Sequence, residues 1–279
     1  MIHEPAFTKE ILEFLSPLDN KVIIDCTLGT GGHTLAIVEA SQNVRVYAID
    51  LDPESIAFAK KRLSKYKDRI EFLNINFAEV DEFIEEKVDG VIMDLGISSF
   101  QLDNPERGFS YQLSGPLDMR FNRFTGRPLS ERLKKLSEWR IGEILKEYGE
   151  EPLARKIGRE IALRKPETTE ELREIVEKAT RGYFTDKTLK RVFQAFRIFI
   201  NQELDNLEEA LPILTEKLKT GGRICVISYH SLEDRIVKNF FKNCDKLKVL
   251  TKKPMEPAEE DINKNKRIRT AKLRVAEKI

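Results

Sequence analysis

The chain has 279 residues, 34% of them charged, and a formal net charge of only +1. This length allows one large or two modest domains with a true buried core, and the balanced charge means that any nucleic-acid surface must be local. The sequence has no apolar run near the roughly 20 residues of a membrane span and no signal-peptide pattern, so we expect a cytoplasmic protein. The three cysteines (Cys26, Cys225 and Cys244) are widely spaced and the histidines form no metal-binding pattern, so we expect buried thiols and no metal site.

The first strong signal is an apolar run that ends at Asp25 and leads into a loop with three glycines, Gly29, Gly31 and Gly32. A β-branched run followed by glycines predicts a buried strand that turns sharply into a helix, because glycine allows positive φ and lets a ligand approach the backbone. A dinucleotide-binding loop would carry a further glycine where this chain has Thr34. The spacing therefore favours S-adenosylmethionine, whose sulfonium and ammonium groups suit an acid at the strand end.

A second predicted strand ends at Asp50, and Asp52 and Pro53 then open a helix. An acid in this position accepts hydrogen bonds from both ribose hydroxyls, in NAD sites as well as in S-adenosylmethionine sites. We therefore predict a nucleoside-cofactor site between the glycine loop and Asp50.

Strand-like and helix-like runs alternate over the first part of the chain. Strands are predicted at 22–25, 44–50, 70–74 and 88–94, with helices at 34–40 and 53–65. Alternation of this kind predicts a parallel, doubly wound sheet. A strand signal returns at 223–228, a helix capped by Ser231 runs to about Phe241, and two short strands follow near 247–251 and 270–277.

Between about 105 and 201 the chain shows no convincing strand. Apolar residues recur there at helical spacing over 133–148, 153–163, 170–179 and 188–211. We therefore predict an α/β fold with a seven-stranded, Rossmann-like class I methyltransferase sheet, its last strand adding on the far side, and an inserted all-helical domain. The sheet domain would comprise 1–104 and 205–279, and the insert 105–204.

Polar residues follow four of the predicted strands, at Asp25, at Asp50, over 94–99 and over 228–231. Ligands of open parallel sheets bind outside the carboxyl ends of the strands, so these residues are expected to meet at one edge. His230 can equally be a structural histidine, and Ser231 a simple helix cap.

Arginines and aromatic residues alternate after the fourth strand. They are Arg107, Arg120, Arg123 and Arg127 with Phe109, Tyr111, Phe121 and Phe124, against the single acid Asp118. Arginine for phosphates and aromatic rings for exposed bases is the combination expected where a flipped or single-stranded nucleotide is held. The alternative is a loop packed under the inserted helices, with arginines that reach the surface along apolar stems.

Two further basic groups could contact a nucleic-acid backbone. The first holds Lys264, Lys266, Arg267, Arg269, Lys272 and Arg274, and the second holds Lys187, Lys190, Arg191 and Arg197. Such contacts are salt-dependent and largely sequence-blind. The first group can also be the polar face of an edge strand, and the second a solvated helix face.

Sequence blocks along nearly the whole chain resemble the RsmH (MraW) family, the bacterial small-subunit ribosomal RNA cytosine-N4 methyltransferases. The blocks are His3-Glu4-Pro5, 25–33, 50–53, 94–103, 107–110, 116–120, 193–198, 228–235 and 271–274. The chain departs from the family pattern at 187–191 and at 265–270. Both departures keep positive charge, so they affect the details of RNA contact rather than the reaction.

The resemblance implies S-adenosylmethionine as cofactor and 16S ribosomal RNA within the small subunit as partner, with a monomer or homodimer and no membrane or metal. It implies that the cofactor is contacted by Gly31, Gly32, His33, Asp50, Phe77, Asp94 and Gln101. The loop pattern adds Asp25 and Gly29 to the predicted cofactor-binding residues. The helical insert would help to recognise RNA, and we expect RNA contacts from Arg107, Arg120, Arg123, Lys190, Arg191, Arg267, Arg269 and Lys272.

The expected reaction is an in-line transfer of the sulfonium methyl to the exocyclic N4 of a cytosine. The N4 lone pair is delocalised into the ring, so the enzyme must hold N4 close to the methyl and accept one of its N–H groups. Asp94 is placed for this role or for orienting the cofactor, and Ser98, Ser99 and His230 are the other candidates.

Three alternatives remain at this stage. A nicotinamide dehydrogenase shares the loop acid and Asp50, and a non-catalytic ribosome-assembly factor could retain the fold as a platform. An amino-methyltransferase acting on DNA or another RNA is the nearest competitor. The Asp94 block, however, lacks the Ser/Asp-Pro-Pro-Tyr motif expected of DNA amino-methyltransferases.

Overall fold

The computed structural model describes residues 5–181 and 185–279, so His3 and Glu4 of the first family block lie outside the described residues. The chain forms two compact units. The first contains the residues up to Ser98 together with Leu204–Ile279, and the second contains Ser99–Glu203. The chain passes between them at 98/99 and 203/204, where the sequence placed the boundaries at 104/105 and 204/205.

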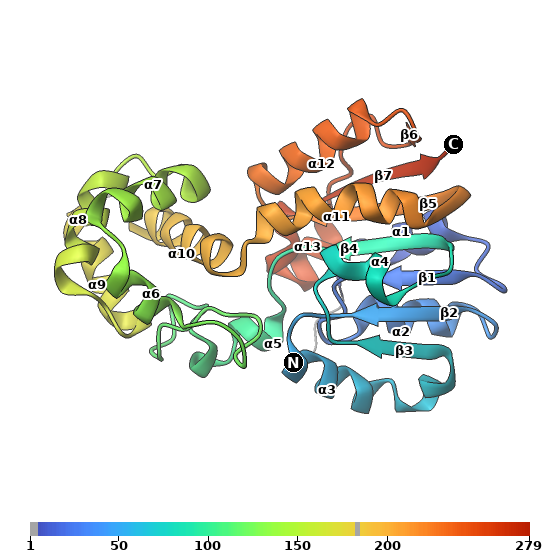
Figure 1. The fold of residues 1–279 in the computed structure, drawn as a ribbon, viewed down its shortest axis with the longest axis horizontal. Helices are drawn as coiled ribbons and strands as arrows, with labels where there is room; N and C mark the ends of the chain where they lie inside the picture. Colours follow the sequence, from blue (N-terminus) through green and yellow to red (C-terminus); the bar gives the residue numbers. More distant parts are fainter. Residues whose placement is uncertain (1–4, 182–184) are drawn as a thin grey trace. The chain divides into compact units, whose positions relative to one another are not determined.

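The first unit is built on a seven-stranded sheet with the strand order β3-β2-β1-β4-β5-β7-β6 (Figure 1). The strands are β1 (Val22–Asp25), β2 (Arg45–Ile49), β3 (Ile70–Leu73), β4 (Val88–Asp94), β5 (Leu218–Ser228), β6 (Leu247–Val249) and β7 (Lys272–Lys278). β1 to β5 pair in parallel, so their carboxyl ends lie along one edge. All four residues of β1 are buried, as expected for a strand covered on both faces.

The last strand is not at the edge of the sheet. β7 runs antiparallel between β5 and β6 and pairs with both. Leu273, Val275 and Ala276 of β7 are fully buried, which suits an interior strand. The prediction that the last strand adds on the far side is therefore refined, because the outermost strand there is β6.

Helices cover both faces of this sheet and form two separate apolar cores (Figure 1). α1 (Thr8–Leu15), α2 (Gly32–Ala40) and α3 (Pro53–Arg62) pack on one face, together with α13 (Glu259–Lys264). α4 (Val80–Phe83), α11 (Glu203–Lys217) and α12 (Ser231–Asn243) pack on the other. Short 3₁₀ turns occupy Ser64–Arg69, Phe77–Glu79 and Lys266–Thr270. The expected α/β fold is confirmed.

The second unit consists of helices and of a long segment without regular secondary structure over 108–128. It contains α5 (Ser99–Leu102), a 3₁₀ turn (Pro105–Arg107), α6 (Leu129–Lys135), α7 (Glu138–Gly149), α8 (Ala154–Arg164), α9 (Thr169–Thr180) and α10 (Thr185–Asn201). α7 packs against both α8 and α10. A Cβ at Gly158 of α8 would lie 2.8 Å from the backbone nitrogen of Gly142 in α7, so glycine is what permits this close helix contact.

Two of the predicted helices are wrong as single elements. The 133–148 pattern divides into α6 and α7, because the Ser137 side chain accepts a hydrogen bond from the Arg140 N–H and starts a new helix. The 188–211 pattern divides at Gln202, whose φ is 52°. Its apolar stripe continues across the break but serves two cores, since Phe196 is buried in the helical unit and Leu207 packs against the sheet.

The cysteines follow the prediction in part. Cys26 and Cys225 are buried free thiols, and burial raises the pKa of Cys225 to about 12. Cys244 is partly exposed because it caps the carboxyl end of α12.

Candidate active site

The carboxyl ends of β1, β2, β4 and β5 bring together the polar residues that the sequence placed after separate strands. Asp25 ends β1, Asp50 follows β2, Asp94 ends β4, and Tyr229 follows β5. The parallel pairing of these strands places the four residues on one edge of the sheet unit. The candidate site is therefore the one expected for an open α/β sheet.

The glycine loop between β1 and α2 is shaped by close contacts. Gly31 precedes α2 with φ 82°, and a Cβ there would lie 2.9 Å from Cδ1 of Leu63. The Arg62 guanidinium donates to the carbonyl oxygen of Thr30 (2.9 Å) and holds the loop from the side of α3. Only glycine fits this turn, because a side chain would meet both an unfavourable φ and a filled space.

Asp25 lies beneath the loop. Its side chain is fully buried, with one oxygen accepting from the Thr27 N–H (3.2 Å) and the other from the Thr34 hydroxyl (2.7 Å). Burial, the largest effect, raises the pKa of Asp25 despite these bonds. This arrangement gives Asp25 a loop-shaping position, and a direct contact with a cofactor stays a prediction.

Asp50 joins the loop to the end of β2. Its two oxygens accept from the Gly29 N–H (2.7 Å) and the Asp52 N–H (2.8 Å). Burial raises the pKa of Asp50 to about 7, although both N–H groups favour the ionised form. A carboxylate has about four lone-pair sites, so each oxygen can still accept one hydroxyl. Asp50 therefore fits a ribose diol, and the side-chain-free backbone at Gly29 and Gly31 fits a ligand that lies against the loop.

Asp94 is held in one orientation by its neighbours. The Tyr229 hydroxyl donates to Oδ1 (2.9 Å), Nε2 of His33 lies 3.3 Å from Oδ2, and the Asp94 N–H donates to the Thr27 hydroxyl oxygen (2.6 Å). The Asp94 side chain is 19% exposed, so part of the carboxylate remains accessible. This is a fixed acceptor at the end of a central strand.

The partners of Asp94 respond to its charge. Burial alone lowers the pKa of His33, but contact with Asp94 and the charges of Asp94 and Asp25 outweigh it, and the net shift is upward. Burial and the Asp94 charge raise the pKa of Tyr229 well above 10. Tyr229 is therefore a neutral donor at neutral pH.

His230 has a structural position. It is the N-cap of α12, where its Nδ1 accepts from the Glu233 N–H (3.4 Å) and its Nε2 lies 3.1 Å from the Glu233 carboxylate. The same carboxylate accepts from the Tyr229 N–H (2.9 Å). The prediction of Ser231 as the cap is wrong by one residue, because the histidine ring occupies that role. A catalytic role for His230 stays a prediction.

Some of the remaining predicted cofactor and catalytic residues lie in the sheet unit and others in the helical unit. Ser98 belongs to the sheet unit, and its Cβ lies 3.7 Å from the position of a Cβ at Gly29. Phe77 is half-buried after β3. Ser99 and the buried Gln101 lie in α5 of the helical unit, so their roles stay predictions.

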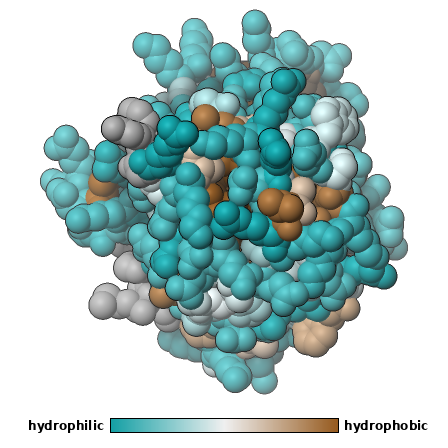
Figure 2. All heavy atoms as spheres, turned by 90° about the vertical axis from the view of Figure 1, so that its left-hand side faces the viewer, coloured by the Kyte–Doolittle hydropathy of each residue, from teal (hydrophilic) through white to brown (hydrophobic). Residues whose placement is uncertain are grey.

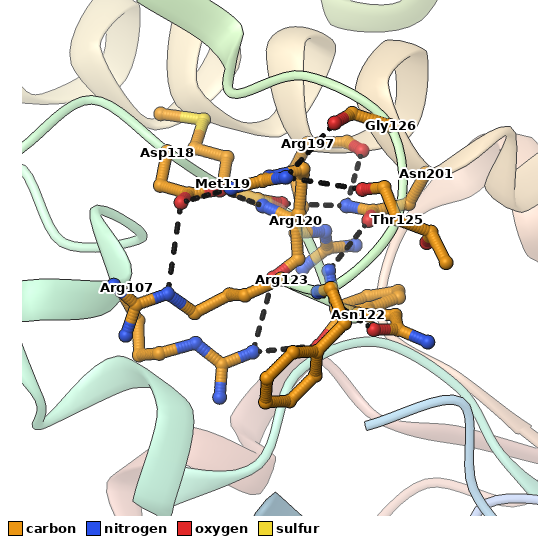
Figure 3. A network of polar contacts seen from close by, with 12 residues as sticks. Arg107, Asp118, Met119, Arg120, Asn122, Arg123, Thr125, Gly126, Arg197 and Asn201 are labelled. Atoms are coloured by element: carbon orange, nitrogen blue, oxygen red, sulfur yellow. Dashed lines mark hydrogen bonds and ion pairs between the residues drawn. The ribbon is translucent and has the colours of Figure 1, made fainter. Parts of the chain in front are cut away.

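The arginine-rich segment contains a buried arginine. Arg107 is 0% exposed, and its guanidinium donates to the carbonyl oxygens of Arg120 (3.0 Å) and Phe121 (2.8 Å), as Figure 3 shows. Arg107 therefore binds its own chain, which favours a structural role, and its RNA contact stays a prediction. The sequence reveals that Arg107 is positively charged but not that its side chain is buried.

The Arg120 guanidinium is also hydrogen-bonded within its own segment. Its Nε and Nη2 donate to the two oxygens of Asp118 (2.7 and 2.9 Å), and its Nη1 donates to the carbonyl oxygens of Thr125 and Gly126 (3.0 and 3.1 Å; Figure 3). These bonds use all three guanidinium nitrogens. The alternative of a loop packed on its own arginines is thus favoured for Arg107 and Arg120. Arg123 lies 3.7 Å from Asp118, and its RNA contact stays a prediction.

The other predicted RNA-binding residues are on the surface. Lys190 pairs with Asp186 (2.7 Å), and Arg191 lies 3.7 Å from Glu151. Arg267 and Arg269 are exposed on the Lys266–Thr270 turn of the sheet unit. Lys272 lies 3.9 Å from Asp234. Their roles in binding stay predictions.

Sequence reasoning missed several residues that build the site. Thr27, Thr34, Arg62 and Tyr229 are each bonded to a predicted residue or to the loop itself. Tyr229 precedes His230 in a sequence block that carries the family resemblance, so this position could have indicated that Tyr229 belongs to the site. The others act through contacts that appear only in three dimensions.

Comparison with known proteins agrees with this geometry. The sequence model of the MraW methylase family matches residues 1–279. The chain belongs to the MraW methylase family. Membership of this methylase family excludes the nicotinamide dehydrogenase alternative and agrees with the S-adenosylmethionine predicted from the glycine loop.

Curated relatives in this family match over nearly their full length. A Thermotoga neapolitana protein named ribosomal RNA small subunit methyltransferase H is 42% identical, over 99% of this chain and 95% of its own. A Trichodesmium erythraeum protein of the same name is 43% identical, over the whole of both chains.

Solved structures share the fold. A Clostridium thermocellum protein described as an rRNA methylase is 15% identical, with a TM-score of 0.52 over the whole of both chains. A Streptococcus mutans protein, described as a methyltransferase and solved in complex with SAH, has the same TM-score, identity and coverage. The fold of this MraW-family chain is that of the class I S-adenosylmethionine-dependent methyltransferases.

The described residues contain neither a membrane-spanning helix nor a cluster of metal-binding side chains. Within residues 5–181 and 185–279, no helix is long and apolar enough to span a bilayer. In the same residues, no group of three His, Cys, Asp or Glu side chains could hold a metal ion.

Proposed function

We propose that the chain transfers a methyl group from S-adenosylmethionine to the exocyclic N4 of a cytosine in 16S ribosomal RNA of the small subunit. Family membership and the names of the relatives support an RNA substrate. The observation that carries the proposal is the Asp94 carboxylate, fixed by Tyr229 and His33 beside the glycine loop. The protein acts in the cytoplasm in this proposal.

The residues of this chain would divide the work as follows. Asp50 holds the ribose, and the Gly29–Gly31 backbone lies against the cofactor, which supplies an electrophilic methyl on its sulfonium when bound. Asp94 accepts an N–H of the cytosine amine, which localises the nitrogen lone pair toward the methyl. Positioning N4 in line with the methyl supplies the rest of the rate enhancement.

Asp94 need not remove the proton before attack. The amine becomes strongly acidic as its bond to carbon forms, so an ionised acceptor in contact with N–H is sufficient. Tyr229 keeps one Asp94 oxygen occupied by a neutral donor. The carboxylate lone pairs that face neither Tyr229 nor His33 would accept from the substrate amine, with Ser98, Ser99 and His230 as further candidates for contact.

The decisive experiment combines product mapping with one variant. We would incubate the protein with labelled S-adenosylmethionine and small subunits that lack the modification, and locate the labelled nucleotide by mass spectrometry. Asp94→Asn should slow methyl transfer by about 100-fold or more, in the range of a lost acid–base contact. Asp68→Asn, at an exposed residue of the same unit, is the matched control and should leave the rate unchanged.

The outcomes separate the possible roles. A loss of turnover with unchanged SAH affinity assigns Asp94 to the amine, and an equal loss of both assigns it to cofactor orientation. Unchanged turnover removes Asp94 from both roles. Labelled DNA or another RNA in place of 16S RNA would support the alternative substrate, and RNA binding without methyl incorporation would indicate a non-catalytic assembly factor.

A further inference from the structure

One aromatic side chain of the arginine-rich segment differs from the others. Phe109 is buried and stacks on Phe121, with ring centroids 5.7 Å apart, and Tyr111 donates its hydroxyl to Asp186 (3.0 Å). Phe124 is 81% exposed, the highest value for a large hydrophobic side chain among the described residues. It therefore adds nothing to the core of the helical unit.

Hydrogen bonds hold the loop that carries Phe124. Arg120 donates to the carbonyl oxygens of Thr125 and Gly126, directly after Phe124. The Phe124 N–H donates to the Asn122 side chain (2.9 Å). The polar network below the ring thus fixes the backbone on both sides of it, so a partner would meet a preorganised ring and lose little conformational entropy.

Asn201 extends the same network to the end of α10. Its side-chain oxygen accepts from the Phe121 N–H (2.8 Å), and its side-chain nitrogen donates to the Met119 carbonyl oxygen (2.8 Å). A helix terminus and two buried or half-buried arginines therefore support one short loop. These hydrogen bonds stabilise the loop while its tip, Phe124, stays exposed.

Two arginines lie close to Phe124 in the sequence. Arg127 is exposed, and the Arg123 side chain is 35% exposed. The face of the molecule drawn in Figure 2 is mostly hydrophilic, with only scattered hydrophobic side chains. A single exposed ring does not make the broad apolar patch of a protein interface. It matches the pairing of stacking platform and phosphate contacts used for single-stranded nucleic acid.

We propose that Phe124 stacks on an unpaired base of the RNA substrate while Arg127 contacts a neighbouring phosphate. The inference rests on the proposed function in taking RNA as the substrate. It assigns base contact to the tip of the loop, while Arg107 and Arg120 hold the loop in shape.

The test measures the affinity of the full-length protein for a short fluorescein-labelled single-stranded RNA across a range of salt concentrations. Phe124→Ala should weaken binding by about 5- to 150-fold, the range for losing one stacked base. The slope of log Kd against log salt should not change, because no charge is removed. Arg127→Gln should instead lower that slope by about one.

Two controls accompany these variants. Phe83→Ala removes an aromatic ring that is 51% exposed in α4 of the sheet unit, and it should leave RNA affinity unchanged. Phe124→Trp should restore binding, since a larger ring stacks at least as well. Thermal unfolding midpoints and SAH affinity of Phe124→Ala should equal those of the original protein, because the ring makes no core contact.

The outcomes are distinct. If the original protein binds the RNA and Phe124→Ala binds equally well, stacking is refuted and the proposed function stands. If the original protein neither binds RNA nor methylates it, the proposed function fails. If Phe124→Ala binds protein-free RNA normally but loses methylation of assembled subunits, the ring docks on a protein and the stacking proposal is overturned.

Discussion

The protonation state of Asp50 should control cofactor affinity near neutral pH. Its carboxylate accepts from the Gly29 and Asp52 N–H groups, and burial raises its pKa to about 7. Ribose hydroxyls donate hydrogen bonds, so they favour the ionised form. With a pKa of about 7, about 10% of the free protein is ionised at pH 6 and about 90% at pH 8. SAH should therefore bind about tenfold more tightly at pH 8 than at pH 6.

Isothermal titration calorimetry of SAH binding measures this directly. Repeating the titration in buffers of different ionisation enthalpy counts the protons released, which should approach one at pH 6. Asp50→Asn replaces one acceptor oxygen by an NH₂ group that faces a backbone N–H. Its SAH affinity at pH 8 should fall by about 10- to 100-fold, as expected for an unsatisfied buried polar group, and should no longer vary with pH.

His33 requires a control, because contact with Asp94 and the charges of Asp94 and Asp25 raise its pKa as well. His33→Gln removes that group and should keep the pH dependence that belongs to Asp50. Equal SAH affinity of the original protein at pH 6 and pH 8, with no proton released, would refute the reasoning.

Two further predictions concern packing. Gly31→Ala should lower both SAH affinity and the unfolding midpoint. The alanine costs about 1–2 kcal/mol for the left-handed φ and adds a clash with Leu63. Calorimetry that finds both values unchanged would contradict this account of the loop. Arg107→Met should reduce the free energy of unfolding by about 2–4 kcal/mol, because two backbone carbonyls lose a charged donor. Urea denaturation checks it against Arg127→Met, an exposed control that should stay near the original stability.

The sequence predicted the parts of the fold that depend on local pattern. β1, β2 and β4 end at or directly before the acids that the pattern marked, because buried parallel strands read as short apolar runs. The glycine loop and the convergence of Asp50 and Asp94 followed from that pattern and from the general position of sites in such sheets.

Other features depend on partners distant in the chain. The division of α10 from α11 at Gln202 leaves the apolar period intact, so spacing alone could not reveal it. Arg107 and Arg120 look like surface arginines until the carbonyl oxygens around them are located. Asp118 is the single acid among four arginines, and it accepts from both Nε and Nη2 of Arg120.

The position of β7 in the sheet affects how the chain folds during its synthesis. β6 pairs with β7 and β7 with β5, so β6 has no place in the sheet until residues beyond Lys272 are available. During synthesis, β5 and β6 therefore expose unpaired edges that invite association with other chains. Proteolysis or a premature stop before Lys272 would remove an interior strand and leave an aggregation-prone remnant, whereas loss of an edge strand would merely shorten the sheet.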